Sequence, residues 1–68
     1  MKFNIEIEQE EDGRWLAEVP ALPGVMVYGP TRAETITRLQ ALALRVLAER
    51  IEHGEEVPEV TAAFWVIP

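Results

Sequence analysis

The chain has 68 residues, 49% of them hydrophobic, and its twelve acidic and six basic side chains give a net charge of −6. A core of this size rarely contributes more than about 3–5 kcal/mol of stability, so small domains usually add a disulfide, a metal or a partner subunit. The chain has no cysteine, which excludes disulfides and thiolate metal sites and leaves association between subunits. The negative charge repels phosphate backbones, so we expect no direct nucleic-acid binding.

The sequence gives no sign of a membrane segment or a secretion signal. No stretch approaches the ~20 apolar residues that a membrane span requires. Residues 1–12 (MKFNIEIEQEED) lack the apolar centre of a signal peptide. We therefore expect a cytoplasmic protein without membrane contact, whose acidic surface either favours a basic partner or serves solubility alone.

Three short strands are predicted in the first 29 residues. Apolar and polar residues alternate in residues 2–9 (KFNIEIEQ), which is the period of a strand with one buried face. Asp12 and Gly13 favour a tight hairpin turn, which leads into a second strand within residues 14–19 (RWLAEV). Residues 25–29 (VMVYG) have the composition of a third strand.

A proline-rich segment, residues 19–24 (VPALPG), separates the second strand from the third. Pro20 and Pro23 have no N–H group to donate to a central sheet, so neither fits within a strand. The residue before a proline favours extended geometry, which predicts a stiff, extended connection here. Gly24 then allows the backbone to turn into the third strand.

A long helix is predicted after the third strand. Thr31 and Glu34 have the spacing of a capping box, which indicates a helix from about Arg32 to His53. Gly54 is the natural residue just beyond its end.

The apolar arc of this helix is wider than the roughly 100° needed to cover one sheet. Leu42 extends the arc on one side, and Leu44 and Ile51 extend it on the other. Two explanations remain open: the sheet curls around the helix, or one flank meets another subunit. The central stripe of the arc consists of Ile36, Leu39, Ala43, Val46 and Leu47.

The chain ends in residues 61–68 (TAAFWVIP), which contain four large apolar side chains in a row. A strand that is apolar on both faces is either central in a sheet or part of an interface, and we predict a fourth strand here. A right-handed crossover places it parallel to the first strand and beside it. The expected fold is thus α+β, in the order β-β-β-α-β, with a small, mainly antiparallel sheet packed on one long helix. The candidate oligomer-interface residues are Leu42, Leu44, Phe64, Trp65, Val66 and Ile67.

Catalytic chemistry is not indicated. The chain contains no serine or cysteine nucleophile, and its one histidine, His53, suits the last turn of a helix, where a positive charge favours the dipole. No Gly-rich phosphate loop is present, and the acidic run around the predicted hairpin lacks the spacing of a calcium loop. We expect no enzyme activity, no catalytic residue, no metal and no cofactor.

Residues 11–34 (EDGRWLAEVPALPGVMVYGPTRAE) resemble the HicB-like antitoxin family. Members of that family have an EDG-aromatic hairpin, a P-x-LPG segment, a Gly-x-Thr and an acid-rich helix start, and residues 53–58 (HGEEVP) resemble a later element of the family. The resemblance implies a partial RNase H-like fold. Longer members continue into a DNA-binding domain, whereas we expect a single domain over residues 1–68 and no separate DNA-binding domain.

The resemblance also implies a function. HicB antitoxins bind and neutralise HicA toxins, which are small basic proteins that cleave mRNA, so we expect an antitoxin of a type II toxin–antitoxin pair that forms a dimer or tetramer. The alternative is a solitary HicB-like module that binds another partner or a small ligand and has no toxin. On charge complementarity, the candidate toxin-binding residues are Glu6, Glu8, Glu10, Glu11, Asp12 and Glu18.

Overall fold

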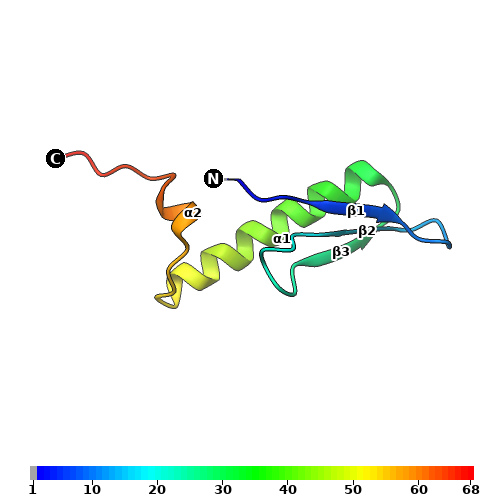
Figure 1. Ribbon diagram of the computed structural model, residues 1–68, viewed down its shortest axis with the longest axis horizontal. Helices are drawn as coiled ribbons and strands as arrows, with labels where there is room; N and C mark the ends of the chain where they lie inside the picture. The colour runs from blue at the N-terminus through cyan, green and yellow to red at the C-terminus, as the bar shows by residue number, and fades with distance from the viewer. Residues whose placement is uncertain (1) are drawn as a thin grey trace.

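The computed structural model describes residues 2–68, which form a three-stranded sheet with one long and one short helix (Figure 1). The strands are antiparallel and lie in the order β1-β2-β3, and helix α1 packs on one face of the sheet. The predicted α+β class, with a small antiparallel sheet on one long helix, is confirmed. The elements are β1 (Glu6–Gln9), β2 (Trp15–Glu18), β3 (Met26–Gly29), α1 (Arg32–Glu52) and α2 (Pro58–Thr61).

The predicted hairpin joins β1 to β2. Ile7 pairs with Ala17, which in turn pairs with Val27 of β3, and this row of side chains packs toward the helix. Gly13 has a φ of +91°, and its N–H donates to the carbonyl of Glu10 at 3.0 Å. The glycine is therefore used for the left-handed backbone conformation that the turn requires.

The segment VPALPG is not the extended connection that the sequence suggested. It folds into two successive turns over residues 19–22 and 22–25, each closed by a backbone hydrogen bond, of 2.9 and 3.0 Å, from the last residue to the first. Pro20 and Pro23 each occupy the second position of a turn, where their fixed φ is favourable. The prolines thus bend the chain instead of holding it straight.

These turns also contribute to the core. Gly24, at the third position of the second turn, has a φ of +85°, which a type II turn requires. The N–H of Val19 donates to the carbonyl of Val25 at 3.1 Å, so the ends of the loop lie together. Val19, Leu22 and Val25 are all buried. The loop is therefore part of the hydrophobic core and not a surface linker.

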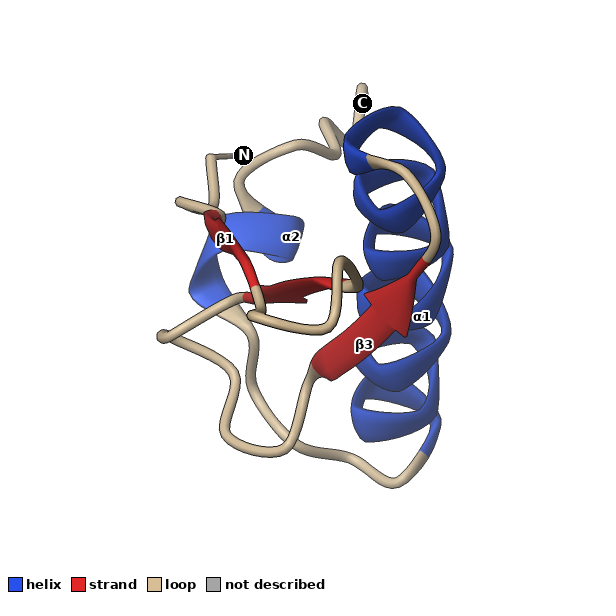
Figure 2. Cartoon of the chain, turned by 90° about the vertical axis from the view of Figure 1, so that its right-hand side faces the viewer, coloured by secondary structure: helices blue, strands red, loops and turns tan. Residues whose placement is uncertain are grey.

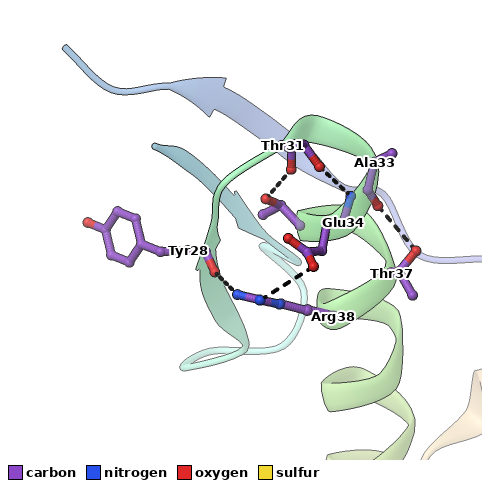
Figure 3. A network of polar contacts seen from close by, with 7 residues as sticks. Tyr28, Thr31, Ala33, Glu34, Thr37 and Arg38 are labelled. Atoms are coloured by element: carbon purple, nitrogen blue, oxygen red, sulfur yellow. Dashed lines mark hydrogen bonds and ion pairs between the residues drawn. The ribbon is translucent and has the colours of Figure 1, made fainter. Parts of the chain in front are cut away.

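Helix α1 begins and ends as predicted. The Thr31 hydroxyl accepts a hydrogen bond of 3.1 Å from the N–H of Glu34, and His53 is the C-cap residue (Figure 3). Gly54 follows with a φ of +81°. The buried side chains of the helix recur every four residues, at Thr35, Leu39, Ala43 and Leu47.

Only one flank of the helix is covered by the chain itself. Leu42 is half-buried and packs against the core, whereas Leu44 is 56% exposed and Ile51 is 46% exposed. The sheet therefore accounts for the Leu42 flank, and the Leu44 flank is open. The buried apolar core consists of Ala17, Val19, Leu22, Val25, Leu39, Ala43, Leu47 and Val57.

The predicted fourth strand is wrong. Residues 58–61 form α2, with Pro58 in its first turn, and residues 64–68 have no regular secondary structure. Val57 is anchored in the core, and the chain beyond α2 leaves the molecule at the end opposite the β1–β2 hairpin (Figure 1). The segment therefore never reaches the edge of β1, beside which it was expected to lie.

The protruding terminus makes the chain elongated. Its dimensions are 53 × 21 × 15 Å, and the radius of gyration is 14.1 Å. A compact domain of this length has a radius of gyration of about 11 Å. Among the helices of residues 2–68, none is long and apolar enough to cross a membrane.

A close contact between β3 and α1 explains why residue 29 is a glycine. A Cβ atom placed on Gly29 would collide with the Oγ1 atom of Thr35 and lie 3.2 Å from its Cα. Thr35 cannot turn away, because it is fully buried and its hydroxyl donates a 2.6 Å hydrogen bond to the carbonyl of Thr31. Glycine thus permits the approach of strand and helix.

This contact can be tested with a double-mutant cycle. We expect Gly29→Ala to lower the free energy of unfolding by about 1–3 kcal/mol, the usual cost of an added methyl in a packed site. The same change should cost less in a Thr35→Ala background, where the colliding hydroxyl is gone. Denaturant unfolding of the four proteins measures both costs, and equal costs in the two backgrounds would contradict the steric explanation.

Candidate functional site

The face of the sheet turned away from α1 is open to solvent. Helix α1 stands to one side of the three strands (Figure 2), and no element of residues 2–68 packs on the other side. Side chains alternate along strands, so every second residue points outward. We call this surface the outer sheet face; its residues are Glu6, Glu8, Leu16, Glu18, Met26 and Tyr28.

Three of the predicted toxin-binding residues come together on the outer sheet face. Glu6 lies directly opposite Glu18 on the neighbouring strand, and Glu8 is the next outward residue of β1. All three line one shallow hollow of about 120 Å³, together with Ile7 and Leu16. The strand register therefore brings together carboxylates up to twelve residues apart in the sequence.

This carboxylate cluster has no basic partner in the part of the chain that is described. The ion pairs found there join Arg14 to Asp12 and Arg38 to Glu34. Like charges directly opposite one another destabilise a sheet. The outer sheet face is thus suited to a cation supplied from outside the chain.

Exposed apolar side chains lie beside the carboxylates. Met26 is 46% exposed and pairs with Glu18, while Tyr28 is 44% exposed and pairs with Leu16. Aromatic residues and methionine are enriched at protein-binding surfaces. Sequence reasoning missed these two residues and Leu16, although the alternation in residues 25–29 places Met26 and Tyr28 on one face.

The other predicted acidic residues occupy a separate place at the hairpin tip. Glu10, Glu11 and Asp12 line a hollow with Arg14, at the far end of the β1–β2 hairpin. Asp12 is already engaged, since it accepts hydrogen bonds from the Arg14 N–H at 3.0 Å and from Nε at 2.7 Å. The predicted set therefore splits into an unpaired cluster on the sheet and a partly neutralised tip.

Arg14 connects the tip to the outer sheet face. Its backbone N–H, and then its guanidinium group, stabilise the ionised Asp12 carboxyl and hold the pKa of that group below its ordinary value. The same guanidinium lies 4.3 Å from the centroid of the Tyr28 ring, within cation–π range. Arg14 thus contacts both the tip carboxylate Asp12 and the Tyr28 ring on the outer sheet face.

Helix α1 carries a second polar contact with the sheet, away from this face. Arg38 donates a 3.3 Å hydrogen bond to the carbonyl of Tyr28 and lies 3.6 Å from the carboxylate of Glu34 (Figure 3). At the other end of the helix, Nδ1 of His53 lies 2.8 Å from the carbonyl oxygen of Glu49. Residues 2–68 contain no group of three or more His, Cys, Asp or Glu side chains placed to hold a metal ion.

The chain is similar to two archaeal proteins. A UPF0150 protein of Thermoplasma acidophilum is 35% identical over 63 residues, which cover 91% of this chain and 90% of that protein. A UPF0150 protein of Archaeoglobus fulgidus is 37% identical over 57 residues, which cover 81% of this chain and 83% of that protein. No family model matches the chain, and no solved structure matches it. The identity and the coverage show that the chain belongs to the UPF0150 family.

Proposed function

We propose that the chain is a HicB-like antitoxin that binds and neutralises a small basic, RNA-cleaving toxin. The observation that carries the proposal is the carboxylate cluster of Glu6, Glu8 and Glu18, which has no basic partner within residues 2–68. The resemblance of residues 11–34 to HicB-like antitoxins supports the identity of the partner.

The chemistry of neutralisation follows from what the toxin must do. A protein that cleaves RNA binds phosphate groups with lysine and arginine side chains. Carboxylates arranged on a sheet would compete with the RNA phosphates for these lysine and arginine side chains. Binding would also relieve the electrostatic repulsion between Glu6 and Glu18. Part of the affinity would therefore come from a repulsion already present in the free antitoxin.

The apolar residues of the outer sheet face would supply the rest of the interaction. Met26 and Tyr28 are exposed and adjacent to the cluster, and aromatic side chains are common binding hot spots. The Arg14 guanidinium already lies over the Tyr28 ring, which would reduce the conformational entropy lost when a partner covers it. In this proposal the antitoxin acts in the cytoplasm.

A solitary binding module without a toxin is the alternative function. The discriminating experiment is co-expression with a small basic reading frame adjacent to the gene, followed by affinity capture and a growth-rescue assay. We expect capture of the basic protein and recovery of growth. A neighbour that slows growth but is neither bound nor neutralised would contradict the antitoxin function.

The binding face can be tested by charge removal at matched sites. We expect Glu6→Gln, Glu8→Gln and Glu18→Gln together to weaken toxin binding by roughly tenfold or more, and to flatten the salt dependence of the association rate. The control combines Glu49→Gln, Glu56→Gln and Glu59→Gln, which removes the same charge from exposed positions outside the sheet. Calorimetry and stopped-flow measurements compare the two. An equal loss of toxin affinity in both variants would show that only net charge matters and would contradict the assigned binding face.

A further inference from the structure

We propose that two copies of this chain form a dimer by exchanging their C-termini. In this dimer the terminal segment, residues 64–67, of each copy lies along the free edge of β1 in the other copy and inserts apolar side chains into the groove beside it. The inference rests on packing and backbone hydrogen bonding, and it does not depend on the proposed toxin.

The terminal segment has the properties of an unpaired strand. Its side chains are between 75% exposed, at Phe64, and 93% exposed, at Val66. Phe64 donates its N–H to the carbonyl of Thr61, but the N–H groups of the next three residues have no backbone acceptor within residues 2–68. Four large apolar side chains next to unpaired backbone groups form a surface that favours strand addition.

A groove of matching chemistry lies beside β1. It has a volume of about 330 Å³, and its lining is apolar except for Gln40. The other lining residues come from the chain before β1, from the end of β2 and from the helix, and they are Phe3, Ile5, Val19, Ala43, Leu44 and Leu47. This is where a fourth strand would lie, and the chain's own terminus leaves it open.

The backbone beside this groove is also unpaired. The β1–β2 ladder ends at Glu6 and Glu18, and Pro20 has no N–H to extend it. Outside that ladder, residues 3–5 make no backbone hydrogen bond to any other part of residues 2–68. Donor and acceptor groups are thus free on both the segment and the edge.

The other edge of the sheet is less suitable. Arg38 reaches from α1 to β3 and donates to the carbonyl of Tyr28 (Figure 3). A long charged side chain at an edge is a common means of preventing strand addition. Among residues 2–68, no side chain from another element reaches across the β1 edge in this way, so we assign it as the acceptor.

The occupant must be a second copy, because the terminal segment points away from its own groove. Val57 and Val60 pack on the core, and the N–H of Ala63 bonds to the carbonyl of Val60, which fixes the direction of the chain after α2. Figure 1 shows the segment running outward from α2. Reaching its own β1 edge would require α2 to unwind and the chain to reverse.

An apolar strip leads from the groove to the terminal segment. Leu44, Ala48 and Ile51 lie at helical spacing on the open flank of α1. Ala48 and Ile51 line a second hollow together with Phe64 and Val66. In a two-fold arrangement the strips of the two helices would face one another between the exchanged segments.

The area available is that of a stable dimer. An aromatic side chain covers about 150–250 Å² when buried, so the four aromatic residues of two terminal segments would bury roughly 600–1,000 Å². Val66, Ile67 and the walls of the two grooves raise the total beyond the ~1,000 Å² expected of a specific interface.

The assembly state is measured first, by sedimentation of the full chain over a wide concentration range. We expect a dimer that Phe64→Asp with Trp65→Asp weakens by at least roughly tenfold. The helical circular dichroism signal should be retained, because these residues lie outside the core and outside α1. Met26→Asp is the matched control, since it adds charge at an exposed apolar residue on the other face and should leave the dimer intact. A monomeric wild-type chain, or a dimer that the terminal variants do not weaken, would overturn the proposal.

Exchange itself is tested with disulfides, which are unambiguous in a chain without native cysteine. A tagged Ile5→Cys chain is mixed with untagged chains carrying Trp65→Cys, Val66→Cys or Ile67→Cys, and the mixtures are oxidised. We expect a disulfide between tagged and untagged chains for at least one position. A chain that carries Ile5→Cys together with one of the terminal cysteines should also form its disulfides with a second chain. A disulfide formed within one chain would show that the terminus folds back on its own sheet and would overturn the exchange.

Discussion

The packing of one helix on one face of a three-stranded sheet is the contact on which the rest of this structure depends. Leu39, Ala43 and Leu47 project from α1 at one-turn intervals into a core that the sheet and the VPALPG loop complete. Gly29 allows β3 to approach the helix at Thr35. Each strand has only four residues, so the sheet contributes few apolar side chains to this contact, among them Ile7, Ala17 and Val27.

The same contact leaves two surfaces of different chemistry uncovered. The outer sheet face carries unpaired carboxylates beside Met26 and Tyr28, which suits a basic protein. The open flank of α1, the groove beside β1 and the terminal segment are apolar, which suits a second copy of the chain. Because the two surfaces lie on different sides of the sheet, a dimer could bind a toxin on each of its two outer sheet faces.

Local patterns in the sequence predicted much of the fold. The Thr31–Glu34 capping box and Gly54 gave the helix boundaries, and the alternation in residues 2–9 indicated the side of β1 that faces the core. The two turns of VPALPG were missed, although the prolines stand three residues apart, each at the second position of a turn. The fourth strand was wrong because a strand exists only with an edge to pair with, and no local pattern in residues 64–67 says which edge that is. Of the site, alternation along β1 and β2 is enough to place Glu6, Glu8 and Glu18 on one face, whereas the pairing of Asp12 with Arg14 depends on turn geometry.

The central claim is that the backbone N–H groups of the terminal segment find acceptors only in another chain. Amide hydrogen exchange of the protein tests this claim most directly. The N–H groups of residues 65–67 have no backbone acceptor within residues 2–68. We predict that they exchange slowly at concentrations where the dimer forms, together with residues 3–5, and that this protection disappears on dilution. Exchange at the rate of a free peptide at every concentration, or protection that dilution does not change, would contradict the account.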